Sequence, residues 1–473
     1  MVAEAAPGPD VRKLLEEIKR NISWEGFQAD RVEKTIQEAL ATLDSVKLHF
    51  LENCVGCAAC APSCPYYYVS EKYGPVEKAE LARNIYRKEA TILGKLLGPL
   101  LNAKKPKSEK DLDTIVEAVY RCTNCGACYV SCPFGIDSGA IIKSILASIA
   151  TKSGRAPTLI AVFDVIEREK LFLKIPSFMY IWNEVMKKAE QALGKPLPFD
   201  KKGAEYFLLV NMADAMFYPD AVIGAMRVLD RAGVDWTLPS KPFAFRPPIA
   251  AVIGLFKQAR EMLKMLNADI SKYEPKNVVL LDGGFVYPWL RFQMPKVLGR
   301  RPSYRVLHIV ELFEKLIKEG KLKLNQTDDK VTWHDPCQLA RRGGVTEEPN
   351  FVLSAASKGF RKLPHHGAES YCCGGGGGIG CMNMEMLEQM GKLLGVSSKD
   401  LVAGEKELEF IQKTAEHWTI AVKRKIDDIK KSGADIVVTA CPVCMHSIAG
   451  GAQLYGLKTQ VRHIAAYIGE RLQ

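Results

Sequence analysis

The placement of cysteine constrains this 473-residue chain more than any other feature. Of its fourteen cysteines, thirteen fall into three groups, and only Cys381 stands outside them. Two groups repeat one spacing, C-x2-C-x2-C-x3-C-P, whereas the third is dispersed through the C-terminal part. The groups are Cys54, Cys57, Cys60 and Cys64; Cys122, Cys125, Cys128 and Cys132; and Cys337, Cys372, Cys373, Cys441 and Cys444. Cysteines in such clusters are typical metal ligands, so the sequence predicts three metal centres.

The first two groups resemble the run that holds [4Fe–4S] clusters in bacterial ferredoxins. Three thiolates two residues apart can cover three corners of a cubane from one tight loop, and the fourth corner is reached from elsewhere. In two-cluster ferredoxins the last cysteine of each run binds the other cluster. The resemblance therefore assigns one cluster to Cys54, Cys57, Cys60 and Cys132 and the other to Cys64, Cys122, Cys125 and Cys128. Zinc is the alternative, but it usually takes two separated C-x2-C pairs.

Cysteine usage and hydropathy indicate a reduced compartment. Disulfides are typical of small secreted domains, whereas this chain is long and its first residues lack the basic and apolar regions of a signal peptide. We therefore expect reduced cysteines in the cytoplasm. No stretch approaches 18 uninterrupted apolar residues, so the sequence predicts no membrane span of its own.

The formal net charge is +11, a basic excess that can attract anionic partners or a negatively charged membrane face. The lysines are dispersed over helical segments, as in residues 104–107 and 423–425. No nucleic-acid-binding module accompanies them. We interpret the charge as solvated surface and expect no binding of nucleic acid.

Apolar residues around both ferredoxin-like runs recur at helical spacing. One series from Leu112 to Tyr120 leads directly into Cys122, and another follows Cys132 over residues 141–149. Residues 11–23 and 29–50 are amphipathic in the same way. The sequence predicts an all-helical domain with two clusters over residues 1–155. A helical linker, whose apolar face we expect to be packed core, follows over residues 156–203.

The remainder of the chain contains an internal repeat. Residues 277–286 align with 435–444, and residues 306–309 align with 461–464, each as short apolar strands separated by loops and helices. The preceding strands, 206–210 and 330–334, align at a shorter offset, so the second copy carries an insertion of about 30 residues. The sequence predicts one α/β copy over residues 204–325 and another over residues 326–473.

The first copy lacks the cysteines of the second. Where the second copy has Cys337, Cys441 and Cys444, the first has Asn211, Gly283 and Val286. We therefore expect only the second copy to bind metal.

Three phrases of the second copy resemble the cysteine-rich CCG domain of the heterodisulfide-reductase family. They are His334-Asp-Pro-Cys337, Cys372-Cys373-Gly374-Gly-Gly and Thr439-Ala-Cys441-Pro-Val-Cys444-Met-His446. The resemblance implies a multidomain α and α/β fold, in which a helical two-cluster ferredoxin domain precedes a pseudo-twofold pair of CCG repeats. Within the family the chain resembles the HdrD type and most closely the DsrK type, from the sulfite-reduction-associated DsrMKJOP membrane complexes. It departs from the family in the 67 residues between Cys373 and Cys441.

In this family the CCG cysteines hold an opened, noncubane [4Fe–4S] centre that accepts substrate sulfur. The resemblance assigns the centre to Cys337, Cys372, Cys373, Cys441 and Cys444. Glycines 374–378 permit the sharp backbone bend that adjacent cysteines need in order to reach one centre. A zinc site with a spare cysteine is the alternative.

Two histidines lie close in sequence to these ligands. His334 is three residues from Cys337 and His446 two residues from Cys444, so each is a candidate to donate a proton at a cluster-bound sulfur. A structural role is the alternative for both.

Other polar residues carry weaker expectations. Arg341 and Arg342, just past Cys337, are candidates to attract an anionic thiolate or carboxylate, or they face solvent. We expect Cys381 to be a plain buried thiol. His308 and His463 occur at the same place in both copies, which favours a role in the fold.

Two functions compete. In the first, the chain is a catalytic subunit in sulfur metabolism, which passes electrons through two cubanes to the noncubane centre and reduces or forms a disulfide or trisulfide. The resemblance implies a membrane cytochrome b-type subunit and a small DsrC-like sulfur-carrier protein as its partners. In the second, it is a relay between a quinone-reactive membrane cytochrome and another redox protein, as in TmcB or a dehydrogenase subunit. Both imply a peripheral position on the cytoplasmic face of the inner membrane through partner subunits.

The cysteine groups predict a metal content. Protein purified without oxygen should carry about 12 iron atoms per chain, because three groups would each hold a four-iron cluster. Elemental analysis of iron, zinc and acid-labile sulfide checks this number. Zinc together with about eight irons would remove the third cluster and with it the catalytic hypothesis.

Overall fold

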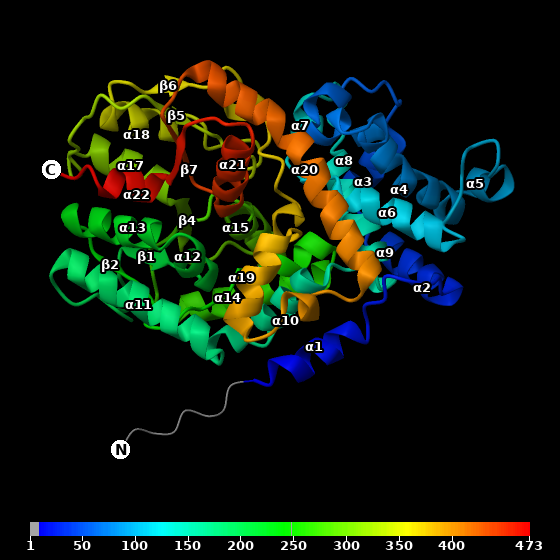
Figure 1. The fold of residues 1–473 in the computed structure, drawn as a ribbon, viewed down its shortest axis with the longest axis horizontal. Coiled ribbons are helices and arrows are strands. Elements are labelled where there is room, and N and C mark those ends of the chain that lie inside the picture. The colour runs from blue at the N-terminus through cyan, green and yellow to red at the C-terminus, as the bar shows by residue number, and fades with distance from the viewer. Residues whose placement is uncertain (1–8, 247) are drawn as a thin grey trace.

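Helices alone form the first part of the chain in this computed structural model, which describes residues 9–246 and 248–473 (Figure 1). The first cysteine run lies between α3 and α4, and the second begins directly after α6. The helices are α1 (Val11–Lys19), α2 (Ala29–Leu40), α3 (Ser45–Glu52), α4 (Pro75–Ala90), α5 (Ile92–Leu96), α6 (Glu109–Tyr120), α7 (Ala127–Val130), α8 (Ser138–Ile141) and α9 (Ala147–Lys152). The prediction of a helical ferredoxin-like domain is confirmed.

The amphipathic segment over residues 29–50 forms two helices. The chain leaves α2 after Leu40, and α3 begins where the Asp44 side chain accepts a hydrogen bond from the Lys47 amide. An aspartate in this position satisfies a free backbone amide and so starts a new helix. The sequence analysis expected no signal peptide at the N-terminus. That expectation concerns residues 1–8, which lie outside the described residues. No helix among the residues described is long and apolar enough to cross a membrane.

The predicted helical linker consists of α10 (Thr158–Arg168) and α11 (Pro176–Leu193). Phe178 and Trp182 of α11 are fully buried, and α11 packs on α13 (Pro219–Arg231) of the first repeat. The apolar face of the linker is therefore packed core, as the sequence analysis expected.

Two four-stranded parallel sheets follow, with the orders β2-β1-β3-β4 and β6-β5-β7-β8. The strands are β1 (Tyr206–Leu209), β2 (Trp236–Thr237), β3 (Asn277–Leu280), β4 (Arg305–His308), β5 (Val331–Trp333), β6 (Arg361–Lys362), β7 (Ile436–Thr439) and β8 (Gln460–His463). The identical strand order agrees with the predicted repeat. The two-residue strands β2 and β6 were not predicted, because so short a segment carries no periodicity.

The two repeats pack on each other through helices in equivalent positions. Helix α13 follows β1 and packs on α22 (Ile464–Gly469), the last helix of the second repeat. Helix α18 (Glu348–Ala356) follows β5 and packs on α17 (Ile309–Lys318), the last helix of the first repeat. This reciprocal pairing is the pseudo-twofold arrangement that the repeat predicts.

Buried histidines support the same interface. The His308 and His463 side chains cap α17 and α22, and Nε2 of each ring lies within hydrogen-bonding distance of the Leu281 carbonyl oxygen, at 3.0 and 3.3 Å. Burial lowers the pKa of His308 to about 3 and that of His463 to about 4, so both stay neutral. Both histidines therefore have the structural role that the sequence analysis favoured.

The insertion in the second repeat is helical. One helix, α14 (Phe256–Ser271), lies between β2 and β3, whereas α19 (Met384–Leu394) and the 28-residue α20 (Glu405–Ser432) lie between β6 and β7. In Figure 1, α20 reaches across to the ferredoxin-like domain. The insertion therefore joins the two parts of the chain.

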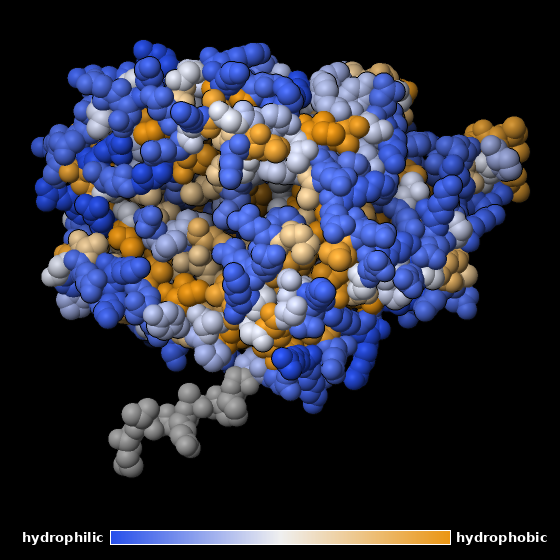
Figure 2. Space-filling model, viewed as in Figure 1, coloured by the Kyte–Doolittle hydropathy of each residue, from blue (hydrophilic) through white to orange (hydrophobic). Residues whose placement is uncertain are grey.

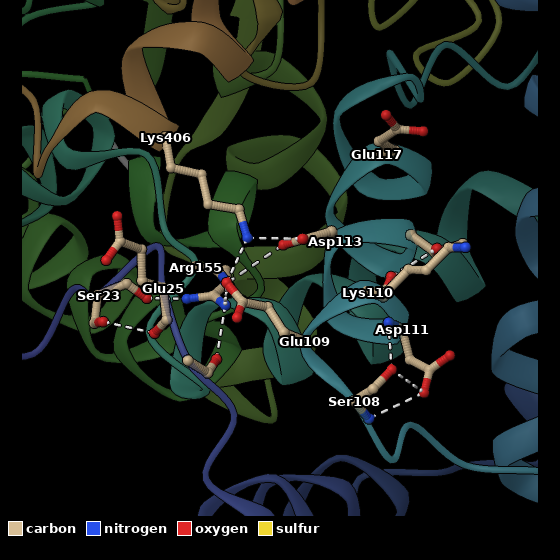
Figure 3. Close-up of polar contacts among 12 residues, drawn as sticks. Ser23, Glu25, Ser108, Glu109, Lys110, Asp111, Asp113, Glu117, Arg155 and Lys406 are labelled. Carbon is tan, nitrogen blue, oxygen red and sulfur yellow. Dashed lines mark hydrogen bonds and ion pairs between the residues drawn. The ribbon is translucent and has the colours of Figure 1, made fainter.

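Ion pairs hold the N-terminal end of α20 against α6 (Figure 3). Lys406 Nζ lies 2.6 Å from a Glu109 carboxylate oxygen and 2.7 Å from one of Asp113. The buried Arg155 guanidinium contacts the same two carboxylates, at 3.4 and 3.7 Å, and donates to the carbonyl oxygens of Ser23 and Gly26. This network links the N-terminal segment, α6 and α20.

Glycine at position 224 is required by the contact between the repeats. A Cβ there would lie 2.4 Å from the Ala465 carbonyl oxygen, and backbone cannot move aside cheaply. Gly224→Ala should therefore lower the free energy of unfolding by about 1–3 kcal/mol, although alanine favours a helix. Gly450→Ala is the matched control, because only ring carbons of Trp418 lie near, the closest at 3.3 Å. Denaturant unfolding without oxygen compares the two, and equal stability of both variants would contradict the close contact.

Candidate metal centres

The cysteines of the two ferredoxin-like runs line two small cavities. One is lined by Cys54, Cys57, Cys60 and Cys132, and the other by Cys64, Cys122, Cys125 and Cys128. The last cysteine of each run thus faces the other run, which is the grouping that the crossed ferredoxin pattern leads us to expect.

Both loops bend in the same way. Gly56 and Ala58 in the first run have positive φ angles of 68° and 57°, and the equivalent Asn124 and Gly126 have 56° and 75°. The left-handed conformation turns the chain tightly enough for successive sulfurs to face one cavity. Pro65 then begins a short helical turn and carries the chain away from the site.

The surroundings of these cavities suit an anionic metal–thiolate cluster. Within the described residues, neither cavity is lined by a carboxylate or an imidazole, so sulfur is the only strong ligand offered there. The buried Lys78 ammonium lies 3.6 Å from Cys64 Sγ and donates to the Arg121 carbonyl oxygen at 2.6 Å. A buried cation beside sulfur favours the thiolate form that a metal requires.

The two cavities are neighbours at different depths. Ser138 lines both of them. Cys57 of the first is exposed, whereas Cys122 and Cys125 of the second are buried. One cavity therefore lies at the surface of the protein and the other towards its interior.

The five remaining motif cysteines line a third cavity, of about 120 Å³. Cys337 follows β5, and Cys441 and Cys444 lie at the start of α21 (Pro442–Leu454), just after β7. Ligand sites in open parallel sheets form at these carboxyl ends of the strands. Cys372 and Cys373 directly precede the glycine loop, residues 374–378. In this loop Gly374, Gly377 and Gly378 have positive φ angles of 84°, 67° and 95°.

His334 provides a test of whether this site suits a bound group. The ring is 1% exposed, and neither of its nitrogens has a hydrogen-bond partner among the described residues. A ring nitrogen and the sulfurs of Cys373 and Cys444 lie within 4.8 Å of one another. A buried polar group without a partner is costly, and a sulfur-rich cluster at these cysteines would provide an acceptor. The site therefore fits an iron–sulfur group.

The second and third cavities are in contact. Cys125 and Cys372 pack together. In the glycine loop, a Cβ on Gly376 would lie 2.7 Å from the Thr123 carbonyl oxygen, and one on Gly377 would lie 2.3 Å from that of Cys122. The three cavities thus form a row, with the exposed Cys57 at one end and the CCG-type site at the other.

Arg341 and Arg342 do not have the roles that the sequence analysis considered. Arg342 pairs with Asp137 at 2.8 Å and donates to the Asn124 side chain at 3.1 Å. Arg341 donates to backbone carbonyl oxygens, among them that of Cys125 at 3.3 Å. Both arginines are engaged by the loops of the second cysteine run, so neither is free to attract a substrate and neither simply faces solvent.

A fourth and much larger cavity, of about 850 Å³, opens beside the third site. It shares Arg246, Ile249, Gly375, Gly380, Cys381 and Val443 with the cavity that the cysteines line. Much of the wall is apolar, with Phe163, Phe217, Phe245, Ile379, Met382 and Trp418. The linker, both repeats and the insertion all contribute to this substrate-sized space.

The two candidate histidines lie in different places. His446 is exposed on the wall of the large cavity, with its ring edge-on to Phe217 at 6.0 Å between ring centroids. His334 lines neither cavity and lies behind the cysteines. Only His446 is placed to meet a molecule that enters from solvent.

Two residues on the shared wall escaped the sequence analysis. Cys381 is partly exposed and lines both cavities, so the expectation of a plain buried thiol is wrong. Arg246 lies 3.5 Å from the buried Asp282 carboxylate, and its backbone amide donates to Glu167 at 2.6 Å. No motif surrounds Arg246, and its partners lie far away in the sequence.

The ligand-free first repeat lies directly on the third site. The Gly283 amide donates to the Ala440 carbonyl oxygen at 2.6 Å, and a Cβ on Gly284 would lie 2.8 Å from Cys441 Sγ. The loop that would carry metal ligands in a complete copy instead packs as bare backbone against Cys441.

Comparisons with known proteins agree with these motifs. Residues 50–136 match the 4Fe-4S dicluster domain, and residues 331–395 and 409–449 match the cysteine-rich CCG domain. The chain thus combines an N-terminal 4Fe-4S dicluster domain with a C-terminal cysteine-rich CCG domain.

Three relatives illustrate the similarity. The Hdr-like menaquinol oxidoreductase iron-sulfur subunit 2 of Archaeoglobus fulgidus is 27% identical, over 79% of this chain and 74% of its own length. The D-type subunit of the dihydromethanophenazine:CoB–CoM heterodisulfide reductase of Methanosarcina acetivorans is 25% identical, over 91% and 96%. The EtfAB:quinone oxidoreductase of Syntrophomonas wolfei is 23% identical, over 85% and 55%. The chain is thus similar to iron–sulfur proteins of redox enzymes.

The grouping of cysteines makes a set of three substitutions informative. Cys64→Ala and Cys122→Ala should remove the same cluster, because both sulfurs face the second cavity, and Cys57→Ala should remove the other. Iron analysis together with paramagnetic resonance of the reduced protein distinguishes the two losses. Since metal binding is also folding free energy, all three variants are compared at equal soluble yield. Loss of the Cys54-containing cluster alone in Cys64→Ala would refute the crossed grouping.

Proposed function

We propose that this chain is the catalytic iron–sulfur subunit of a membrane-associated redox complex and that it cleaves or forms a disulfide or trisulfide. The observation that carries the proposal is the large cavity of about 850 Å³ beside the third cysteine site. A centre that only relays electrons needs a short path to its partner but no space for a substrate. A centre that acts on sulfur needs both.

The proposed ligand sets follow the row of cavities. One cubane is assigned to Cys54, Cys57, Cys60 and Cys132, and the other to Cys64, Cys122, Cys125 and Cys128. The noncubane centre is assigned to Cys337, Cys372, Cys373, Cys441 and Cys444. When bound, these clusters would supply one-electron transfer and an iron site for sulfur.

The protein's own residues prepare this site in four ways. The apolar wall keeps water away from a bound sulfur compound. The Arg246 guanidinium lines both cavities, unlike Arg342, and its pairing with Asp282 is longer, at 3.5 Å, so it is assigned the attraction of a substrate carboxylate or thiolate. His446 is the proton donor of the proposal, because its imidazole faces the space where a leaving thiolate would emerge. His334, which lines neither cavity, is assigned a hydrogen bond to the bound cluster on the side away from the large cavity.

The proposed partners come from the resemblance and from the names of relatives. Two relatives are named as parts of a menaquinol oxidoreductase and of a heterodisulfide reductase. We assign to this chain a cytochrome b-type membrane subunit as electron donor and a small DsrC-like sulfur-carrier protein as substrate. A DsrK-like place in sulfur metabolism, on the cytoplasmic face of the inner membrane, completes the proposal. The presence of only one cysteine-complete repeat supports this DsrK-like assignment, because one repeat provides one centre, at which the chemistry would proceed in steps.

The test uses a thiol probe on the oxidised, cluster-loaded protein. Because the third site opens on a cavity, 3-mercaptopropionate should reach it and produce a new paramagnetic signal. The signal should vanish in Cys373→Ser. It should survive Cys57→Ala, which removes only the first cluster. A wild-type protein without any thiol-dependent signal would leave the relay function standing and remove the catalytic one.

A cavity-filling variant tests the route to the site. Ala449 lines the large cavity, so Ala449→Trp should raise the thiol concentration for half-maximal signal by about tenfold at unchanged iron content. Ala192→Trp, at an exposed position of α11, is the matched control. Cys381→Ser is unsuitable as a neutral control, because Cys381 lines both cavities. Equal thiol concentrations for both tryptophan variants would show that thiols do not enter through this cavity.

A further inference from the structure

Among the described residues, exposed apolar side chains gather in one segment away from the sheets and the large cavity. Residues 91–103 form a lobe around α5 at the end of the molecule opposite the sheets, and Figure 2 shows hydrophobic residues gathered there. We call these residues the apolar lobe. Its exposed members are Ile92 (78%), Leu93 (61%), Leu96 (74%), Leu97 (45%), Leu100 (84%) and Leu101 (39%). A contiguous apolar surface of this kind marks an interaction site.

The backbone of the apolar lobe is largely satisfied from within. The Lys95 and Leu97 amides donate to the carbonyl oxygens of Thr91 and Leu93, at 3.1 and 2.7 Å. The Leu101 and Ala103 amides donate to those of Leu97 and Gly98, at 3.2 and 2.8 Å. Lipid offers no hydrogen bonds, so backbone can enter it only when its polar groups are already paired. The apolar lobe meets this requirement with its leucines facing outward.

Positive charge surrounds the apolar lobe. Residues 90–108 include four lysines and no acidic residue. Lys105 is engaged with Glu33 and Glu89, at 2.5 and 3.0 Å, whereas Lys95, Lys104 and Lys107 are exposed. Lysines that border exposed leucines complement the phosphates of an anionic bilayer, into whose interface the apolar side chains can dip.

Lipid accounts for this composition better than a protein surface does. Specific protein interfaces pair polar groups across the contact, and lysine is depleted in them. The exposed side chains between Ile92 and Asn102 are apolar except for Lys95 and Asn102. The surface therefore offers hydrophobic area and positive charge but almost nothing for directional pairing.

We infer that the apolar lobe binds directly to an anionic lipid bilayer, with Ile92, Leu96 and Leu100 in the interface and Lys95, Lys104 and Lys107 at the headgroups. This contact is additional to any membrane subunit, and it does not depend on the chemistry of the third site. It also gives the first cysteine cavity a position. Glu52 and Tyr86 line the base of the lobe, and Glu52 is two residues from Cys54. The first cysteine run thus begins next to the proposed membrane contact.

The experiment is flotation of the purified, cluster-loaded chain with lipid vesicles. Vesicles of phosphatidylcholine and phosphatidylglycerol in about a 7:3 ratio should carry the wild-type protein, and binding should weaken without the anionic lipid or in about 1 M salt. Ile92→Ser with Leu96→Ser and Leu100→Ser should lower the partition coefficient by at least about tenfold. The matched control is Tyr180→Ser with Met265→Ser and Ile420→Ser, which removes exposed apolar side chains elsewhere.

Charge is tested in the same way. Lys95→Glu with Lys104→Glu and Lys107→Glu should weaken binding by about tenfold or more, whereas Lys187→Glu with Lys188→Glu and Lys202→Glu, on a distant exposed surface, should change it far less. Leu96→Trp adds a direct readout, because brominated lipid should quench the added fluorescence. The inference is overturned if wild-type protein does not float with anionic vesicles, if the serine variant of the lobe floats as well as its control, or if binding requires a membrane protein in the vesicles.

Discussion

The close approach of the glycine loop to the second cysteine run holds the third candidate centre against the second. Glycines at positions 376 and 377 press against the carbonyl oxygens of Thr123 and Cys122, where no Cβ would fit. Lys143 also links α6 to the glycine loop, since its buried ammonium donates to the carbonyl oxygens of Val119 and Gly377, both at 2.8 Å. Because Cys372 and Cys125 pack together there, a shift of the loop would separate the third site from the other two.

Two departures from a simple pair of repeats serve the same site. In the first repeat, the missing ligands leave Gly283 and Gly284 as bare backbone that can lie against Ala440 and Cys441. In the second, the insertion supplies α20, which is tied to the ferredoxin-like domain by Lys406 and by a 2.6 Å hydrogen bond from Arg121 to His417. The same insertion provides α19 and residues of α20 that wall the large cavity. The loss of ligands in the first repeat and the insertion in the second thus both help to enclose the third site.

The sequence analysis was most accurate where chemistry depends on neighbours in the chain. Spacing within a cysteine run, helical periodicity up to Cys122 and the repeat of strands were all readable, since each is a local pattern. It failed for Arg341 and Arg342, whose partners Asn124 and Asp137 are distant in sequence. It also failed for Cys381, because the wall on which that thiol lies is assembled from several elements. Arg246 had no motif at all.

By itself, the sequence determined that the chain has two ferredoxin-like runs, a repeated α/β unit and a single cysteine-complete copy. These features follow from residue type and spacing, which act over a few residues. Tertiary structure alone decided that the second and third cavities touch, that the third one opens on a large apolar space, and that leucines of the apolar lobe remain exposed. The physical reason is burial: which side chains lose contact with water depends on packing between distant segments, and no local pattern records it.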